Sequence, residues 1–176
     1  MKLAELLDEA ASRQLATFRE RMKNSTQQQE QAEAEPQVKV QIEGDEELKK
    51  AAEVLGLSSI KYFDLKQNRT QNYVFSFQQM LDPRGNTGVY LIYAYVRICS
   101  ILRKVGYSEG ANLDDYKLKT SVPQERDLAL TLLRLPEAVE AAAKDLMVNR
   151  VTDILYEISQ RVSDFYNHAR VIGSAE

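Results

Sequence analysis

The stretch TGVYLIYAYVRICSILRKV, residues 87–105, decides the fold that we expect for this chain. Thr87 is a suitable N-cap, and a helix from there to Val105 would be about 28 Å long. Apolar side chains occupy most of its circumference, so we expect this helix at the centre of a bundle. These side chains are Val89, Leu91, Ile92, Val96, Ile98, Cys99, Leu102 and Val105.

Three more helices are predicted downstream, after a loop at residues 107–122. The first, Gln124–Arg134, is interrupted by Pro136, which then begins a second helix to about Met147. The third, Asn149–Arg170, has an i, i+3, i+4, i+7 pattern, formed by Val151, Ile154, Leu155, Ile158, Val162, Phe165 and Ala169. Four helices with short connections predict a mainly α fold with a helical bundle.

The residues upstream of this bundle are less uniform. Residues 3–22 have the spacing of an amphipathic helix. The stretch NSTQQQEQAEAEPQVKVQIEGDEE has no aromatic residue and cannot bury enough apolar surface to order itself, so a flexible insertion is predicted there. We therefore expect a leading helix at 1–23, an insertion at 24–44, an α-rich segment at 45–85 and the bundle at 86–176.

Within the α-rich segment, short elements are predicted. A helix at Glu46–Leu55 should end at Gly56, in the left-handed position that glycine favours. Ser58 should cap another short helix through Leu65. The aromatic and β-branched stretch YVFSF, Tyr73–Phe77, is typical of a brief extended segment.

Charge is distributed unevenly along the chain. Residues 57–106 carry a net charge of +5, whereas the whole chain carries −3, so the remainder is strongly acidic. A basic segment inside an acidic protein indicates a surface for a polyanion. The alternative is that these charges only solvate helix faces.

Residues that could perform catalysis or bind a metal are few. There is no GxxxxGK[ST] and no GxGxxG nucleotide signature. The one histidine, His168, has no partner at metal-ligand spacing and is predicted to be a surface residue. The one cysteine, Cys99, is predicted to be a core thiol, and the adjacent Asp114 and Asp115 to be turn residues. We therefore expect no catalytic residue and no metal site in this chain.

One constellation is typical of RNA recognition. Tyr90, Tyr93, Arg97 and Lys104 share one stripe of the helix predicted at 87–105. Aromatic rings beside basic groups offer unpaired bases a face to stack on and phosphates a charge. The alternative is that the tyrosines are half-buried core residues. Tyr166 and Arg170 repeat the pairing on the last predicted helix.

The stretch IKYFDLKQNRTQNYVFSFQQMLDPRGNTGVYLIYAYVRICSILRK, residues 60–104, closely resembles eukaryotic-type arginyl-tRNA synthetases. The tracts RLPEAVEAA and YEISQRVSDFY also fit later helices of that family. The resemblance implies a class I synthetase whose full-length form uses ATP, with magnesium, to attach arginine to tRNA-Arg. It implies a stem-contact segment followed by a DALR-type anticodon-binding bundle.

The resemblance also implies roles for single residues. The loop Asp82–Gly88, which contains Arg84 and Asn86, would touch the inside of the anticodon arm. Tyr93 and Arg97 would face anticodon-loop nucleotides, with Tyr166 beside them. Tyr90 and Arg170 are carried over although the family varies more at these positions.

Several features depart from the family. HIGH-like and KMSKS-like motifs are absent, so the chain alone is expected to be inactive and to need no cofactor. Family members continue beyond the final VIGSAE, so we expect a truncated bundle whose open face, including Val151, Ile154 and Ile158, is covered by the missing catalytic domain or another protein. The alternative function is a non-catalytic, synthetase-derived subunit of a larger assembly, with a structural or RNA-binding role.

The remaining expectations concern partners and compartment. The expected partner is the anticodon arm of tRNA-Arg, and neither DNA nor a membrane is expected. No apolar run approaches the roughly 20 residues that would cross a bilayer, and one cysteine permits no internal disulfide. The cytoplasm is therefore the expected location, with an organelle as the alternative.

Overall fold

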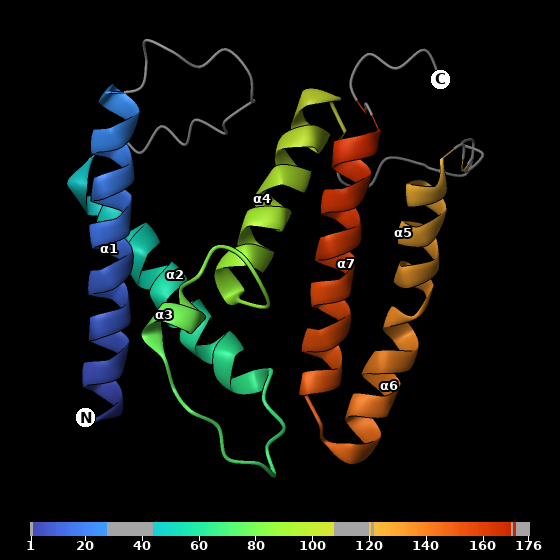
Figure 1. Cartoon of the computed structure of the whole chain (residues 1–176), viewed down its shortest axis with the longest axis horizontal. Helices are drawn as coiled ribbons and strands as arrows, with labels where there is room; N and C mark the ends of the chain where they lie inside the picture. Colours follow the sequence, from blue (N-terminus) through green and yellow to red (C-terminus); the bar gives the residue numbers. More distant parts are fainter. Residues whose placement is uncertain (1, 28–43, 108–119, 121, 170, 172–176) are drawn as a thin grey trace. The chain divides into compact units, whose positions relative to one another are not determined.

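The computed structural model describes residues 2–27, 44–107, 120, 122–169 and 171, and over these residues the chain is helical, with no β-strand. Figure 1 shows the helices in chain order. They belong to two compact units. Unit 1 comprises Met1–Asp64 and Val74–Val89, and unit 2 comprises Leu65–Tyr73 and Tyr90–Glu176. The prediction of a mainly α fold is confirmed.

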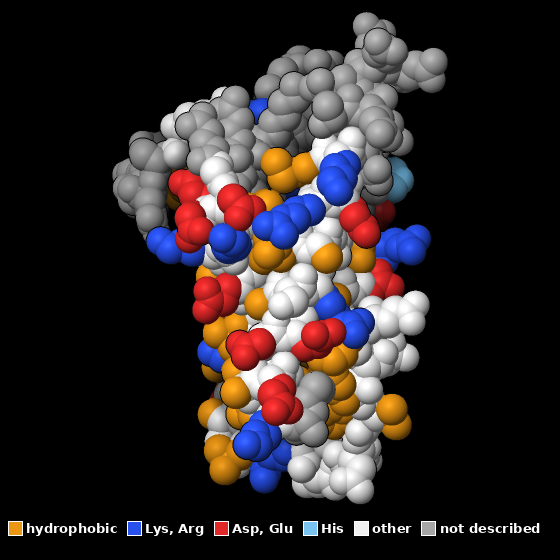
Figure 2. All heavy atoms as spheres, turned by 90° about the vertical axis from the view of Figure 1, so that its left-hand side faces the viewer, with side chains coloured by type: hydrophobic (Ala, Val, Ile, Leu, Met, Phe, Trp, Pro, Cys, Tyr) orange, Lys and Arg blue, Asp and Glu red, His pale blue; other side chains and the backbone are white. Residues whose placement is uncertain are grey.

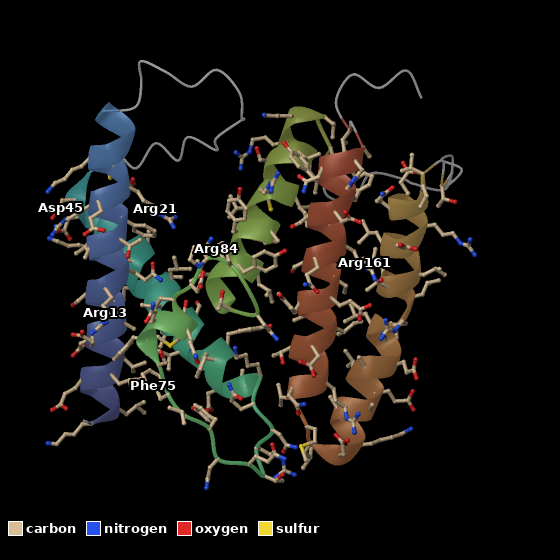
Figure 3. The ribbon with its side chains drawn as sticks, in the orientation of Figure 1. Arg13, Arg21, Asp45, Phe75, Arg84 and Arg161 are labelled. Atoms are coloured by element: carbon tan, nitrogen blue, oxygen red, sulfur yellow. The ribbon has the colours of Figure 1, made fainter. Side chains whose placement is uncertain are left out.

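Unit 1 is built on two long helices, α1 (Leu3–Gln27) and α2 (Asp45–Leu65). α1 extends beyond residue 22, where the sequence pattern had ended it. A salt bridge joins the two helices, with Arg19 Nη2 lying 2.7 Å from Asp45 Oδ1. Figure 3 labels Asp45 beside α1.

α2 corrects the prediction of two short helices separated by Gly56. The helix is continuous from Asp45 to Leu65, and both Gly56 and Ser58 lie within it. Gly56 is buried, and a Cβ placed on it would stand 2.8 Å from the backbone nitrogen of Ala11. The glycine is therefore needed where α1 and α2 approach each other closely, and it does not end a helix.

An aromatic cluster completes unit 1. The stretch at residues 72–76 is neither helical nor paired with a strand, and α3 (Phe77–Met80) begins where Ser76 accepts a hydrogen bond from the backbone nitrogen of Gln79. Phe75 packs edge-on against both Phe63 and Phe77, with ring centroids 6.0 and 4.9 Å away. Met80 is fully buried beneath this cluster.

Unit 2 is the predicted bundle. Its helices are α4 (Gly88–Lys104), whose first two residues still belong to unit 1, α5 (Pro123–Leu133), α6 (Leu135–Asp145) and α7 (Asn149–His168). Pro136 stands at the start of α6, as predicted. Thr87 directly precedes α4, and its hydroxyl donates to the carbonyl of Asp82 at 2.6 Å, which closes the preceding loop. Asp114 and Asp115 lie outside the described residues, as does most of the segment 24–44.

The central position in this bundle is held by α7, so the prediction that the helix at 87–105 would be central is wrong. α7 packs against α5 and α6, and it contacts α4 through Tyr156 and Ser163 (Figure 1). α4 leaves Tyr93 and Tyr95 largely exposed. Most of the apolar side chains around α4 are partly buried, so the helix is partly covered on several sides and is not enclosed by the bundle.

The prediction of an open apolar face on α7 is wrong for Ile154, which is only 4% exposed. Apolar side chains are more exposed on α5, where the exposed fractions of Leu130 and Leu133 are 50% and 75%. Arg161 extends from α7 toward α5, 3.9 Å from Asp127 (Figure 3). The face of α7 that carries Ile154 is thus covered by its neighbours, whereas Val151 and Ile158 are partly buried. Among the described residues, no helix combines the length and the apolar character needed to span a membrane.

Candidate nucleic-acid interface

The centre of the candidate interface is the side chain of Arg97, which lies between two aromatic rings. Its guanidinium carbon is 4.0 Å from the ring centroid of Tyr166 on α7 and 5.4 Å from that of Tyr93 on α4. The Tyr93 contact follows from helical geometry, because residues four apart in a helix are neighbours. The Tyr166 contact requires α4 and α7 to pack side by side. We call these three residues the Arg97 cluster.

The cluster presents both a charge and flat surfaces. Tyr93 is 53% exposed, so about half of its surface is accessible to a ligand. Arg97 and Tyr166 are half-buried. A guanidinium stacked on rings is held in place yet keeps its positive charge, since arginine is not deprotonated in proteins. Such a site can stack an unpaired base and neutralise a phosphate.

Tyr90 has a different environment, although it lies on the same stripe of α4. Its hydroxyl lies 3.2 Å from Ser163 Oγ, and its ring packs edge-on against Tyr156 with centroids 5.6 Å apart. Ser163 Oγ donates its proton to the carbonyl of Ser159 at 3.0 Å, so Tyr90 is the donor in the first bond. Tyr90 thus joins α4 to α7, which agrees with the alternative that the tyrosines are half-buried core residues. Tyr93 is exposed and can still serve as a stacking surface for a base.

The basic residues at the end of α4 are exposed. Arg103 and Lys104 occupy its last turn, where cations interact favourably with the negative end of the helix dipole. Lys104 lies two turns after Arg97 on the same stripe, so the stripe ends at the C-terminus of α4 with a basic side chain. Arg170, the other basic residue predicted for the interface, lies outside the described residues.

Two predicted site residues, Arg84 and Asn86, belong to unit 1. The Arg84 side chain is 92% exposed and its Nε lies 3.9 Å from Asp82 Oδ1. Asn86 is half-buried, and its side-chain carbonyl accepts a hydrogen bond from the Tyr62 hydroxyl at 2.6 Å. Arg84 is therefore available to a ligand. The hydrogen bond between Tyr62 and Asn86 helps to shape the loop that carries Arg84. Figure 3 labels Arg84.

Other charged surfaces differ from this one. Figure 2 shows the side of the molecule on which α1 lies, and acidic and basic side chains alternate over it. Short-range pairs explain part of this mixture, for example Arg13 with Glu9 at 2.6 Å. A face with both signs of charge does not attract a polyanion as a whole.

The residues considered for catalysis or metal binding have ordinary surroundings. His168 is exposed, and its Nδ1 lies 2.8 Å from the carbonyl oxygen of Asp164. Cys99 is partly buried on α4. Within the described part of the chain, no group of three or more His, Cys, Asp or Glu side chains could hold a metal ion.

Two contacts between distant parts of the chain could not be predicted from the sequence. Tyr156 packs against Tyr90, and Arg69 bonds to the end of α6, each across a long stretch of chain. Periodicity identifies residues that share a helix face, but it does not show which residue of another element meets that face.

Two family models match most of the chain. Residues 91–176 match the DALR anticodon-binding domain, and residues 1–77 match the catalytic domain of class I tRNA synthetases of the arginine type. The second match covers the leading helix and most of the segment at 45–85, which correspond to the end of the catalytic domain.

Named relatives agree with the family models. The chain is 41% identical, over its whole length, to the chloroplastic/mitochondrial arginine–tRNA ligase of Arabidopsis thaliana and to the cytoplasmic one, of which it covers 25% and 27%. It also resembles the crystal structure of arginyl-tRNA synthetase from Plasmodium falciparum, with a TM-score of 0.72 and 30% identity over 96% of this chain and 27% of that one. The chain thus spans about a quarter of the length of these relatives.

Proposed function

This chain belongs to the arginyl-tRNA synthetases, as their DALR domain together with the end of the catalytic domain, and we propose that it binds the anticodon arm of tRNA-Arg. In this proposal the bundle at residues 86–176 receives the anticodon loop. The residues that would contact RNA are Tyr93, Arg97, Tyr166, Lys104 and Arg84, with Arg170 as a further candidate.

The observation that carries this proposal is the Arg97 cluster. It combines a half-buried guanidinium, fixed on the Tyr166 ring, with the exposed ring of Tyr93. Unpaired bases stack on aromatic rings and on guanidinium planes. An anticodon loop supplies such bases together with phosphates, so its chemistry matches both parts of the cluster. Tyr90 and Asn86 would act indirectly, by holding α4 on α7 and by shaping the loop around Arg84.

We infer that arginine activation requires parts of the enzyme that this sequence does not contain. The family is a class I synthetase family, which uses ATP. A HIGH-type motif needs two histidines, and these 176 residues contain one. The chain alone should therefore show no arginine-dependent exchange between ATP and pyrophosphate, and binding of ATP and magnesium would belong to the full-length enzyme.

The comparisons favour part of a ligase over a synthetase-derived subunit with another role, because both family models and the named relatives are tRNA synthetases. The catalytic domain is accordingly the proposed protein partner of the bundle. The relatives include a cytoplasmic and a chloroplastic/mitochondrial enzyme. We propose the cytoplasm for this chain, with an organelle as the alternative.

The proposal is tested by RNA binding at two salt concentrations. Arg97→Ala should weaken binding of a tRNA-Arg anticodon stem-loop and lower the log–log salt slope by roughly 0.7–0.9 if Arg97 neutralises one phosphate. Tyr93→Ala should cost about 1–3 kcal/mol with little change in slope, because stacking releases no counterions.

Two matched variants serve as controls. Arg126→Ala removes an exposed charge from α5, and Tyr95→Ala removes a ring that is 66% exposed on another face of α4. Both should bind like the wild type. If a scrambled loop binds as well as the anticodon loop, and all four variants behave alike, the proposed function is wrong.

A further inference from the structure

Two leucines on α5 are exposed to solvent. Leu130 and Leu133 are 50% and 75% exposed, whereas Thr131, on the side of α5 that packs in the bundle, is only 4% exposed. Asp127 reaches from α5 toward Arg161, so α7 lies on that packed side. Exposed leucines alone are common on protein surfaces. The charges beside these two leucines are what distinguish this face.

An arginine and a glutamate flank the two leucines at equal spacing. Arg126 comes four residues before Leu130, and Glu137 comes four residues after Leu133. Spacings of four, three and four place side chains on one side of a helix. Only Arg134 separates α5 from α6, and its φ of −83° and ψ of −10° lie in the right-handed helical region, so the helical rotation continues into α6 (Figure 1). We call Arg126, Leu130, Leu133 and Glu137 the leucine stripe.

The two charges of the leucine stripe differ from the other charges of these helices. Among the described residues, neither Arg126 nor Glu137 forms an ion pair. About 16 Å of helix separates the two residues, so they do not reach each other. Most other charged side chains of α5 and α6 are paired within the chain, namely Asp127 with Arg161, Arg134 with Glu157, Lys144 with Glu140 and Asp145 with Arg150. The stripe therefore offers two exposed charges of opposite sign to a partner outside the chain.

The order of residues in the leucine stripe makes it complementary to itself. Read backwards, the stripe has the same spacing with the signs of its end charges exchanged. A second copy turned about a two-fold axis between Leu130 and Leu133 therefore places Glu137 of one copy opposite Arg126 of the other, at both ends. The same rotation places Leu130 of each copy against Leu133 of the other. Two-fold interfaces between identical chains have this property, that residue i meets j and j meets i.

We propose that the leucine stripe is a self-association surface, on which a second copy of this chain docks with its own stripe antiparallel. The leucines supply apolar contact at the centre, and the two ion pairs at the ends fix the register. Because the stripe is short, its interface belongs to the small, transient class, and we expect a dimer with a Kd of roughly 10–100 µM. The Arg97 cluster is made by α4 and α7, so this inference goes beyond the proposed function and does not depend on RNA.

Sedimentation equilibrium of the full chain without RNA, at about 5 to 500 µM, measures this association. The average mass of the wild-type chain should rise with concentration toward that of a dimer and no further, because a two-fold interface closes on itself. Leu133→Ser should raise the Kd by about tenfold or more, since it removes apolar surface from the centre of the interface. The Leu133 side chain is 75% exposed in one chain, so urea unfolding at low concentration should show an unchanged fold and stability.

Charge reversal tests the register of the two copies. Arg126→Glu alone sets two glutamates opposite each other at both ends, and Glu137→Arg alone sets two arginines opposite each other, so each should raise the Kd by about tenfold. An equimolar mixture of these two variants should form a heterodimer with a Kd within about threefold of the wild type, because every facing pair again has opposite charges. The double variant should dimerise equally well by itself.

Lys144→Glu is the matched control for net charge. It changes the charge of the chain as much as Arg126→Glu does, but Lys144 lies two turns beyond Glu137 and pairs with Glu140 of its own chain at 2.7 Å. Its Kd should stay within about twofold of the wild type, because surface charges outside the interface act weakly through salt.

Each contrary result overturns the inference in a distinct way. A wild-type chain that stays monomeric throughout this range would show that a different partner, and not a second copy, covers the leucine stripe. Association unchanged by Leu133→Ser would place the dimer contact on another face. A mixture of Arg126→Glu and Glu137→Arg that stays dissociated would show that the two residues do not meet across a two-fold axis. None of these results bears on the binding of the anticodon stem-loop, which is measured separately.

Discussion

The Arg97 guanidinium carbon lies 4.0 Å from the centroid of the Tyr166 ring, so the residue proposed to meet RNA is also part of the packing between α4 and α7. Cation–π contacts of this kind contribute from about 0.5–1 kcal/mol at exposed sites to about 2 kcal/mol where water is excluded. Substitutions here therefore change both stability and RNA affinity, and the two effects have to be measured separately.

A double-mutant cycle should detect the contact. We expect Arg97→Met and Tyr166→Leu to show a coupling of about 0.5–1.5 kcal/mol in the free energy of unfolding, because each change alone removes the same contact. Urea unfolding of the four proteins measures this coupling. Tyr166→Leu combined with Arg126→Ala is the control cycle, and it should be additive within about 0.5 kcal/mol. Additivity in both cycles would contradict the contact.

The Tyr90 hydroxyl should matter for stability and little for RNA. Tyr90→Phe removes the hydrogen bond to Ser163 but keeps the ring against Tyr156. We expect the free energy of unfolding to fall by about 0.5–1.5 kcal/mol, with the RNA affinity of the folded protein unchanged. Ser163→Ala should have a similar effect. A loss of RNA affinity at unchanged stability would instead make Tyr90 a direct RNA contact.

The sequence predicted what depends on periodicity within one helix. The stripe that holds Tyr93 and Arg97 is a property of α4 alone, and the break at Pro136 is local too. By contrast, the central position of α7 depends on which helix faces which, and the apolar circumference of residues 87–105 gave a misleading indication of it. Only the family resemblance placed Tyr166 beside Arg97, because no local pattern connects residues on two different helices.

Gly56 shows why a local rule can fail. Glycine is common just after a helix, so a helix end was a reasonable prediction. Glycine is equally suited to positions where two backbones come close, and α1 occupies that space at Gly56. Arg69 is a similar case, since a cap supplied by a distant segment leaves no trace near α6 itself.

Alanine at position 56 should therefore destabilise unit 1. Its Cβ would lie 2.8 Å from the backbone nitrogen of Ala11, and backbone cannot move aside as a flexible side chain can. We expect Gly56→Ala to cost about 1–3 kcal/mol, the usual range for overpacking. Without that contact, alanine would instead stabilise a helix interior by roughly 0.5–1 kcal/mol.

Thermal or urea unfolding decides the sign of the Gly56→Ala effect. Val54→Ala is the control on the same helix, where the side chain is 62% exposed and little change is expected. A stabilised Gly56→Ala protein would show that the two helices do not approach as described.

Leu146 should be a position where glycine stabilises the protein. Its φ of 57° and ψ of 32° are left-handed, and its side chain is 66% exposed, so leucine has backbone strain there and little packing to offset it. Glycine relieves roughly 1–2 kcal/mol of strain but loses more chain entropy on folding, about 0.5–1 kcal/mol. The expected net effect of Leu146→Gly is thus a gain of about 0.5–1 kcal/mol in the free energy of unfolding.

The neighbouring Val148 provides the matched control for this change. Val148 is also exposed, at 46%, but its φ of −62° and ψ of −26° are those of a right-handed helix. Val148→Gly should therefore destabilise the protein, since glycine gains nothing at an unstrained position. Opposite signs for the two glycine variants in urea unfolding would establish the strain at Leu146. A loss of stability in both would mean that the leucine side chain packs in a way that its exposure does not suggest.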